Sequence, residues 1–507
     1  MNETSISTRQ SWLARLLRQR WARWLGVILV IPTLGLAALA AYVAAVFMED
    51  EPVAYEDPVE HFKYGSTGGE RESGFPYWIF QAMPRVCERH LPGGYESLGM
   101  VFEDGKDLPV GMSMRRYQGV DRTFLNCAVC HASTVRDAPD AKPRVITGMP
   151  ANTFNVWGFQ KFFFECGKDP KFAAEYVVPE VDRLMRERGR KLGLVDRYVV
   201  YPVAVALMRE RLIMLSGRFE ELLNYPEWGP GRVDTFNAAK VLFNFPLKDL
   251  PPHEKNAPSD FPSIWLQQPR KGMQLHWDGN NTKVEERNRS AAFGTGTTPA
   301  TLDNAAIERV ERWLATAAPP KYPYPIDAAK AARGATLYAT YCASCHGATG
   351  RDFAGKYVGR VTPLAAVGTD RRRLDSYTYD LAVNQATLYI DEPWQFRNFR
   401  KTFGYANMPL DGLWLRAPYL HNGSVPTLRD LLEPAAQRPR EFYRGNDVYD
   451  PQKVGFVSGV PAQGARKFFP FDTRTPGNSN AGHDGKAYGT ELLPADKDAL
   501  VEYLKTF

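Results

Sequence analysis

Two copies of a five-residue motif constrain the fold of this chain more than any other feature. Cys127-Ala128-Val129-Cys130-His131 and Cys342-Ala343-Ser344-Cys345-His346 both read Cys-x-x-Cys-His. Two thiols one helical turn apart can add to the two vinyl groups of one porphyrin, and the adjacent histidine can then bind the iron. A zinc site would need further cysteines or paired histidines close by, and none follows either motif.

The two motifs predict two covalently bound haem c groups. A redox dithiol is the alternative for each motif, and two complete copies in one chain disfavour it. The predicted haem attachment residues are Cys127, Cys130, Cys342 and Cys345, and the predicted proximal iron ligands are His131 and His346.

An uncharged apolar stretch precedes the motifs. Residues 25–48 carry no charged side chain, and a helix of this length would extend about 36 Å, enough to cross a hydrocarbon core of about 30 Å. Five arginines lie in residues 1–24 and three acidic residues occupy 49–51. The positive-inside rule therefore predicts a cytoplasmic basic segment (1–24), an inner-membrane anchor (25–48) and a periplasmic body. A cleaved signal peptide, with an apolar region of usually about 7–15 residues, is the alternative.

Charge and cysteine count narrow the function classes further. The net charge of the 507 residues is +6, and the first 24 residues alone carry +4 of it. The remainder therefore has no basic patch of the kind that binds nucleic acid. Cys87 and Cys166 lie outside the motifs; in an oxidising compartment they could form a disulfide, or they could be two buried thiols.

The two motif-bearing halves align as an internal repeat. Trp265-Leu266 is echoed by Trp414-Leu415, and 275–279 is echoed, after a shorter gap, by 420–423. Both halves end in a segment with helical spacing, at 307–314 and 494–504. We expect an N-terminal haem domain (60–314) with a helical insertion within 160–250, a Pro-rich linker (315–325) and a C-terminal cytochrome c domain (326–507).

The repeat predicts that the two irons differ. Phe293 lies 20 residues before Trp313, and His483 lies 20 residues before Tyr503, so Phe293 and His483 are equivalent. A second histidine would close the C-terminal iron and suit it to electron transfer, whereas phenylalanine cannot bind iron and would leave the N-terminal haem open to dioxygen or peroxide. Other candidate sixth ligands remain: Met408 and His421 for the C-terminal haem, and His276, Met149 and His90 for the N-terminal haem.

Trp277 has two interpretations, a bridge between the haems or a core aromatic. Its place next to His276, in the Asp278-Gly279 turn, favours the bridge weakly.

These residues resemble a known group of proteins, the bacterial di-haem cytochrome c peroxidase superfamily. The shared features are the two Cys-x-x-Cys-His motifs, the Trp277-Asp278-Gly279 turn and the segment 418–423. The segments 77–79, 91–95, 126–127 and 477–483 look closer to its rubber oxygenase branch of di-haem dioxygenases. The resemblance covers residues 70–507.

The resemblance implies roles for individual residues. It makes His131 the ligand of a dioxygen-binding haem, Phe293 the distal aromatic beside it, and Trp277 a residue between the haems. His346 and His483 would hold the C-terminal haem. With the residues reasoned from the repeat, the candidate catalytic residues are therefore Phe293, Trp277 and His276.

The expected fold is mainly α, with short helices and long irregular loops around cofactors that supply part of the core. The expected function is a haem-dependent oxidoreductase that uses dioxygen on an unsaturated lipid or isoprenoid, since rubber oxygenases are secreted and this chain is predicted to be anchored. Its other expected partners are a periplasmic electron donor and the membrane. A hydrogen peroxide-reducing peroxidase and a non-catalytic electron carrier are the alternatives.

Overall fold

The computed structural model describes Trp21, Trp24 and residues 30–507, and the chain divides into two compact units. The smaller unit includes the apolar helix Val30–Phe47, none of whose side chains is buried. A helix of this length and composition can cross a membrane or serve as a signal sequence. The basic segment predicted at 1–24, apart from Trp21 and Trp24, and the first five residues of the predicted anchor lie outside the described residues.

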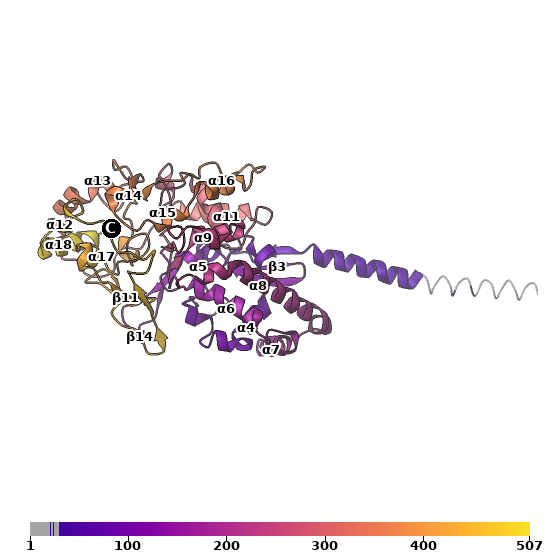
Figure 1. Cartoon of the computed structure of the whole chain (residues 1–507). Helices are drawn as coiled ribbons and strands as arrows, with labels where there is room; N and C mark the ends of the chain where they lie inside the picture. Colours follow the sequence, from indigo (N-terminus) through magenta and orange to yellow (C-terminus); the bar gives the residue numbers. More distant parts are fainter. Residues whose placement is uncertain (1–20, 22–23, 25–29) are drawn as a thin grey trace, which may run out of the picture. The chain divides into compact units, whose positions relative to one another are not determined.

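The larger unit comprises residues 52–115 and 122–507 and contains both motifs (Figure 1). The helices of its N-terminal half are α2 (Pro58–Tyr64), α3 (Gly69–Ser73), α4 (Tyr77–Val86), α5 (Ala128–His131), α6 (Val156–Lys168), α7 (Ala174–Glu187), α8 (Tyr201–Leu223), α9 (Thr235–Leu242), α10 (Val284–Phe293) and α11 (Asn304–Leu314). Those of its C-terminal half are α12 (Ala328–Tyr341), α13 (Ala343–His346), α14 (Leu364–Val367), α15 (Arg372–Ser376), α16 (Tyr379–Thr387), α17 (Leu428–Leu431) and α18 (Pro494–Leu504).

Short antiparallel ladders join these helices. The longest hairpin pairs β3 (Met112–Tyr117) with β4 (Val120–Leu125), and β2 (Phe75–Pro76) pairs with β4. The two-stranded ladders are β5 (Ala132–Val135) with β6 (Arg144–Thr147), β7 (Arg232–Val233) with β8 (Ser259–Asp260), β9 (Val361–Pro363) with β10 (Gly404–Ala406), β11 (Glu441–Arg444) with β16 (Phe469–Asp472), β12 (Tyr449–Asp450) with β13 (Gly455–Phe456), and β14 (Ala462–Gln463) with β15 (Arg466–Lys467).

The prediction of a mainly helical fold is thus only partly confirmed. Helices and long loops dominate, but the many ladders were not predicted. Except for β3 and β4, their strands have only two to four residues, too few to show an alternating pattern.

The same helix pairing occurs in both halves. In the C-terminal half, α12 and α18 cross so closely that a Cβ atom on Gly334 would lie 2.0 Å from the carbonyl oxygen of Ala499, so only glycine fits there. Tyr338 of α12 packs on Tyr503 of α18 with ring centres 5.3 Å apart. In the N-terminal half, Phe62 of α2 packs on Trp313 of α11 at 4.7 Å. This shared arrangement supports a duplicated domain.

The N-terminal half differs by long insertions. Phe62 precedes its haem motif by 65 residues, whereas Tyr338 precedes the second motif by four. The predicted insertion within 160–250 is helical, with α7, α8 and α9 inside it, and a disulfide between Cys87 and Cys166 ties the segment after α4 to α6. The disulfide alternative for these two cysteines is therefore the one that the structure has.

The predicted linker, residues 315–325, packs on both halves. Its Ala317 carbonyl accepts from the Leu266 amide at 2.8 Å, and its Pro320 carbonyl accepts from the Trp414 indole at 3.0 Å. Both motif-bearing halves belong to one compact unit, and the predicted domain boundaries stay predictions.

Candidate functional site

Both motifs form one short helix each, and each motif histidine makes the same hydrogen bond. Nδ1 of His131 in α5 donates to the carbonyl oxygen of Pro262 at 2.9 Å. Nδ1 of His346 in α13 donates to the carbonyl oxygen of Met408 at 2.8 Å. Because a carbonyl only accepts, the proton of each neutral ring lies on Nδ1, and Nε2 is left as a basic ligand. This is the tautomer that an iron ligand needs.

The surroundings keep both rings neutral near pH 7. Desolvation, together with a smaller effect of the Arg287 guanidinium, lowers the pKa of His131 to about 4. Desolvation also lowers the pKa of His346, against a smaller opposing effect of the bond to Met408. Among residues 30–507, no group of three or more His, Cys, Asp or Glu side chains could hold a metal ion on its own.

His483 faces His346 at a spacing that suits a shared iron. Their ring centres are 6.4 Å apart. Two imidazoles on opposite sides of one metal, each with a metal–nitrogen distance of about 2 Å, have ring centres about 6 Å apart. Nδ1 of His483 is buried and has no hydrogen-bond partner within the described part of the chain. The donor set and its spacing therefore fit a haem iron held from both sides.

Arg438 fixes the loop that carries His483, and no sequence signal pointed to it. Its buried guanidinium donates to the carbonyl oxygen of His483 at 2.9 Å. It also donates to four further carbonyl oxygens, those of Leu431, Glu433, Asn480 and Gly482. One side chain thus orients the whole turn, as second-sphere partners of metal ligands do.

The rival ligands for the C-terminal iron are less well placed. Met408 contacts the Nδ1 side of His346 through its carbonyl, the side of the ring away from Nε2. The Tyr405 hydroxyl uses its proton to donate to the carbonyl of Asp370. It can therefore only accept from Nε2 of His421, which lies 3.1 Å away, and this nitrogen is already hydrogen-bonded. Both contacts favour His483.

Two rivals for the N-terminal iron have other partners. His90 bonds the Asp169 carboxylate at 2.9 Å, and Met149 is fully buried in a core cluster with Trp265. Phe293, the residue equivalent to His483 in the repeat, ends α10 and packs on Tyr389 and Phe396, with ring centres 5.2 Å and 6.3 Å away.

The spacing of the closing helices agrees with this equivalence. α11 and α18 are both 11 residues long, and each end of α11 lies 190 residues before the matching end of α18, the same separation as Phe293 from His483. The local backbone differs, since Phe293 is helical and His483 lies in a loop.

The loops around Trp277 correct one detail of the predicted repeat. A β-bridge joins Leu275 to Asn281, and another joins Tyr419 to Val425, so in both loops the bridged residues are six positions apart. In both loops the residue that follows the first bridged residue has a positive φ: 65° at His276 and 68° at Leu420. Trp277 is therefore equivalent to His421, and His276 is equivalent to Leu420. The predicted pairing of Leu275-His276 with Leu420-His421 is one residue out of register, because the shared Leu-His pair was aligned instead of the bridged positions; the shorter gap in the second half remains.

The side chain of Trp277 forms a hydrogen bond with the segment that contacts His131 of the first motif. Its indole Nε1 donates to the carbonyl oxygen of Asp260 at 2.7 Å. Asp260 lies two residues before Pro262, whose carbonyl accepts the hydrogen bond from His131.

The backbone of Trp277 forms a hydrogen bond with the segment that contacts His346 of the second motif. Its carbonyl accepts from the amide of Ala406 at 2.8 Å. Ala406 lies two residues before Met408, whose carbonyl accepts from His346. A path of covalent and hydrogen bonds therefore runs from one motif histidine to the other through Trp277.

His276 and Arg287 lie close to this region. Nδ1 of His276 donates to Oδ1 of Asn280 at 2.6 Å, and the ring stacks on Phe399. Desolvation, with a small contribution from Arg287 and against the opposing effect of Asp278, lowers the pKa of His276 to about 4. Arg287 thus acts electrostatically on both His131 and His276, a role that its sequence position did not indicate.

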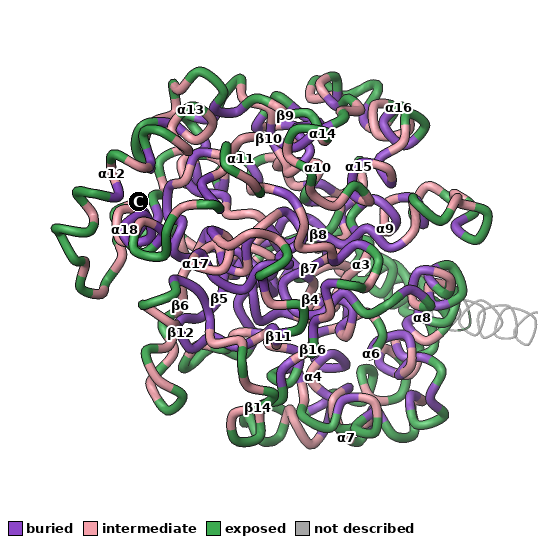
Figure 2. The backbone as a smooth tube through the Cα atoms, turned by 60° about the vertical axis from the view of Figure 1, so that its left-hand side comes forward, coloured by how far each residue is buried: buried purple, intermediate pink, exposed green. Residues whose placement is uncertain are grey.

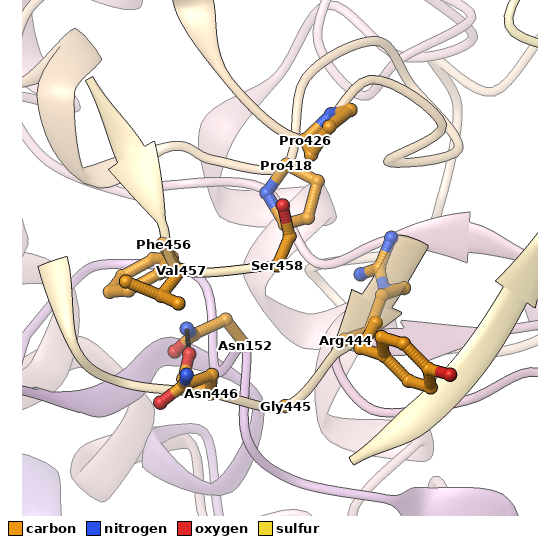
Figure 3. Close-up of a pocket in the computed structure, with 10 residues that line it drawn as sticks. Asn152, Pro418, Pro426, Arg444, Gly445, Asn446, Phe456, Val457 and Ser458 are labelled. Atoms are coloured by element: carbon orange, nitrogen blue, oxygen red, sulfur yellow. Dashed lines mark hydrogen bonds between the residues drawn. The ribbon is translucent and has the colours of Figure 1, made fainter. Parts of the chain in front are cut away.

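Two cavities in the described residues differ in size and lining. The cavity drawn in Figure 3, between Asn152, Pro418 and Arg444, has a volume of about 10 Å³, room for a single water molecule. A larger one of about 270 Å³ is lined mainly by polar and charged side chains between α10 and α11, among them Glu285 and Glu311.

Two known protein families match segments of the C-terminal half of the chain. Residues 331–411 match the cytochrome c family, and residues 404–444 match the family described as RoxA-like, cytochrome c-like. This region is therefore similar to cytochrome c domains, which hold haem c covalently. Neither match reaches the first motif or His483.

Two similar proteins come from Sinorhizobium fredii (strain NBRC 101917 / NGR234). Uncharacterized protein y4iM is 33% identical over 290 residues, which cover 49% of this chain and 64% of that protein. Uncharacterized protein y4iJ is 28% identical over 485 residues, which cover 75% of this chain and 76% of that protein. The chain therefore spans less than two thirds of the length of the first relative.

Proposed function

We propose that this chain is a di-haem c-type cytochrome oxidoreductase, anchored in the bacterial inner membrane with its body in the periplasm. The haem at His131 would activate dioxygen toward an unsaturated lipid or isoprenoid, and the haem between His346 and His483 would transfer electrons. The observation that carries this proposal is the contrast between Phe293 and His483 at equivalent places in the repeat.

Haem c, when bound, supplies an iron that exchanges one electron and that binds dioxygen or peroxide where a coordination position is free. The chain's own residues decide which of these occurs. His346 and His483 would occupy both sides of one iron, and the Met408 carbonyl and Arg438 would keep the two rings oriented. His131 would hold the other iron through Nε2, with Pro262 fixing the ring.

The surroundings of Phe293 suit an oxygen-binding pocket. Phe293 packs with Tyr389 and Phe396 in an apolar cluster, which excludes water from the side chains that it covers. The match to a RoxA-like family supports dioxygen as the oxidant and an unsaturated hydrocarbon as the substrate class. The apolar helix Val30–Phe47 supports a substrate that dissolves in membranes.

One observation favours a peroxidase as the second candidate. A peroxidase would need two electrons from a donor for each peroxide, and His131 and His346 would hold the two haem groups between which these electrons would pass. The hydrogen-bonded path through Trp277 joins the two proximal histidines and suits this delivery. An oxygenase that adds both oxygen atoms to its substrate has less need of such a path.

Product analysis separates the two candidates. The purified chain is incubated with dioxygen and unsaturated lipids or isoprenoids, and separately with hydrogen peroxide and a reduced electron donor. Oxygenated products with dioxygen alone support the dioxygenase. Turnover only with peroxide and donor supports the peroxidase.

The haem count is tested independently by a pyridine haemochrome assay. We expect two haems per chain, and one after Cys127→Ser or Cys342→Ser. A count of one in the unaltered protein would contradict the proposal.

A further inference from the structure

Helix α8 is apolar on two opposite faces, and the protein covers only one of them. The inner face, which includes Val205, Met208 and Leu212, is buried in the core of the N-terminal half. On the outer face Val203 is 53% exposed and Leu207 is 62% exposed. A surface helix of a globular protein normally carries polar side chains on its outer face. The outer face of α8 therefore needs a separate explanation.

The turn that leads into α8 extends this apolar face. Residues Asp196–Val200 form a π-helical turn directly before Tyr201. Val195 and Val199 are exposed and precede Val203 and Leu207 at intervals of four residues, so they continue the same side of the helix. Tyr198, also in the π turn, is 72% exposed. We call Val195, Tyr198, Val199, Val203, Leu207 and Met214 the outer α8 surface; exposed stretches along α8 are visible in Figure 2.

Basic residues surround the outer α8 surface. Residues 186–211 contain seven arginines and lysines against three acidic residues, a net charge of +4 in a chain with +6 overall. Arg190 and Lys191 are exposed just before the π turn, and Arg211 is exposed beyond Leu207. An apolar strip bordered by basic side chains is typical of helices that lie in the interface of an anionic bilayer.

We propose that the outer α8 surface docks into the headgroup region of a bilayer that contains anionic lipid. The charge complementarity favours such a lipid surface over a protein partner, and the span-length helix Val30–Phe47 gives the same chain a second membrane-binding element. The proposal goes beyond the haem chemistry and rests only on the membrane localisation in the proposed function. Docking would keep the folded body against the lipid, where an apolar substrate dissolves.

Site-directed spin labelling of the full, haem-loaded chain in vesicles tests the docking. A nitroxide is attached through Val203→Cys, and the matched control carries it through Lys330→Cys, an exposed position on α12. Collision of each label with dissolved oxygen and with a water-soluble nickel chelate is measured in vesicles of phosphatidylglycerol and phosphatidylcholine. At position 203 we expect the ratio of oxygen to nickel accessibility to exceed that at position 330 by at least several-fold. Equal ratios would overturn the proposal.

Two further measurements separate docking from its alternatives. The ratio at position 203 should fall in pure phosphatidylcholine and in the Val199→Glu/Leu207→Glu variant; an unchanged ratio in both would overturn the proposal. A label at 203 that becomes immobilised in detergent without lipid, increasingly at higher protein concentration, would instead identify a second copy of the chain as the occupant. Alkaline extraction of membranes tests the anchor on its own. A protein that this treatment releases from the membrane, but whose label at position 203 keeps the high ratio of oxygen to nickel accessibility, contradicts the anchor and not the docking.

Discussion

The guanidinium of Arg438 donates a hydrogen bond to the carbonyl oxygen of His483 at 2.9 Å. It also donates to the carbonyls of Asn480 and Gly482 in the same turn, and to those of Leu431 and Glu433 at the end of α17. These bonds hold the backbone from which His483 faces His346. Arg438 is therefore a positioning residue for the proposed sixth ligand rather than a ligand itself.

Arg438→Ala should loosen that turn. Loss of a charged donor to several buried carbonyls costs about 3 kcal/mol of stability, and part of the C-terminal haem should change from low spin to high spin. Thermal unfolding and the visible spectrum measure the two effects. Arg474→Ala is the control, because Arg474 forms only surface ion pairs with Asp472 and Glu441. A low-spin spectrum unchanged by Arg438→Ala would contradict the positioning role.

His483→Ala should open the C-terminal iron. The low-spin signal of that haem should turn high-spin, since one strong ligand is lost, while the N-terminal haem keeps its spectrum. His421→Ala and Met408→Leu are the matched controls: Nε2 of His421 is bonded to Tyr405, and Met408 contacts His346 through its backbone. If either control abolishes the low-spin signal and His483→Ala does not, the ligand assignment is wrong.

Trp277→Phe should slow electron transfer between the haems. The substitution removes the indole hydrogen bond to Asp260 and leaves an aromatic ring in place. We expect at least a tenfold slower interhaem step by stopped-flow reduction, with unchanged haem content. Trp394→Phe, in the aromatic cluster with Tyr389, is the control. Equal rates in wild type and both variants would assign Trp277 to the core alone.

Replacing Cys87 and Cys166 together by serine should destabilise the N-terminal half without changing the haem count. The disulfide closes a loop between positions 79 residues apart, and removing such a crosslink costs about 2–5 kcal/mol. A chemical unfolding curve and a haem assay give the two readouts. Loss of a haem in this variant would mean that the disulfide supports haem attachment directly.

Much of the site arrangement could be predicted from the sequence because it depends on local spacing. The motif spacing predicted α5 and α13 as short helices with their histidines, and the offset of the closing helices related Phe293 to His483. The register of the Trp277 loop could not be predicted, because it is set by backbone bridges between residues of different identity.

Contacts between segments far apart in the chain could not be predicted from the sequence either. Arg438 precedes His483 by 45 residues, and Arg287 acts on His131 across a long stretch of chain. Each acts only once the fold is complete, and single arginines carry no periodic or motif signal. The short β ladders escaped prediction for a related reason, since their pairing, not their sequence pattern, defines them.

Substitution of Phe293 gives a direct test of the proposed open haem. Phe293→Ala should alter carbon monoxide binding without creating or destroying a low-spin signal, because the removed side chain does not bind iron. Phe293→His should lower carbon monoxide binding and activity together, since a second imidazole would compete for the free position. Retained binding in a folded Phe293→His protein with both haems would place Phe293 away from the iron.

The central claim is that the two irons differ in their ligands. Electron paramagnetic resonance of the oxidised, unaltered protein tests this claim most directly. Visible spectra of the reduced protein, recorded before and after addition of carbon monoxide, complete the test. The account predicts one six-coordinate low-spin haem with two imidazole ligands, and one haem that binds carbon monoxide. Two low-spin haems that bind no external ligand in either redox state would contradict it and identify the chain as an electron carrier.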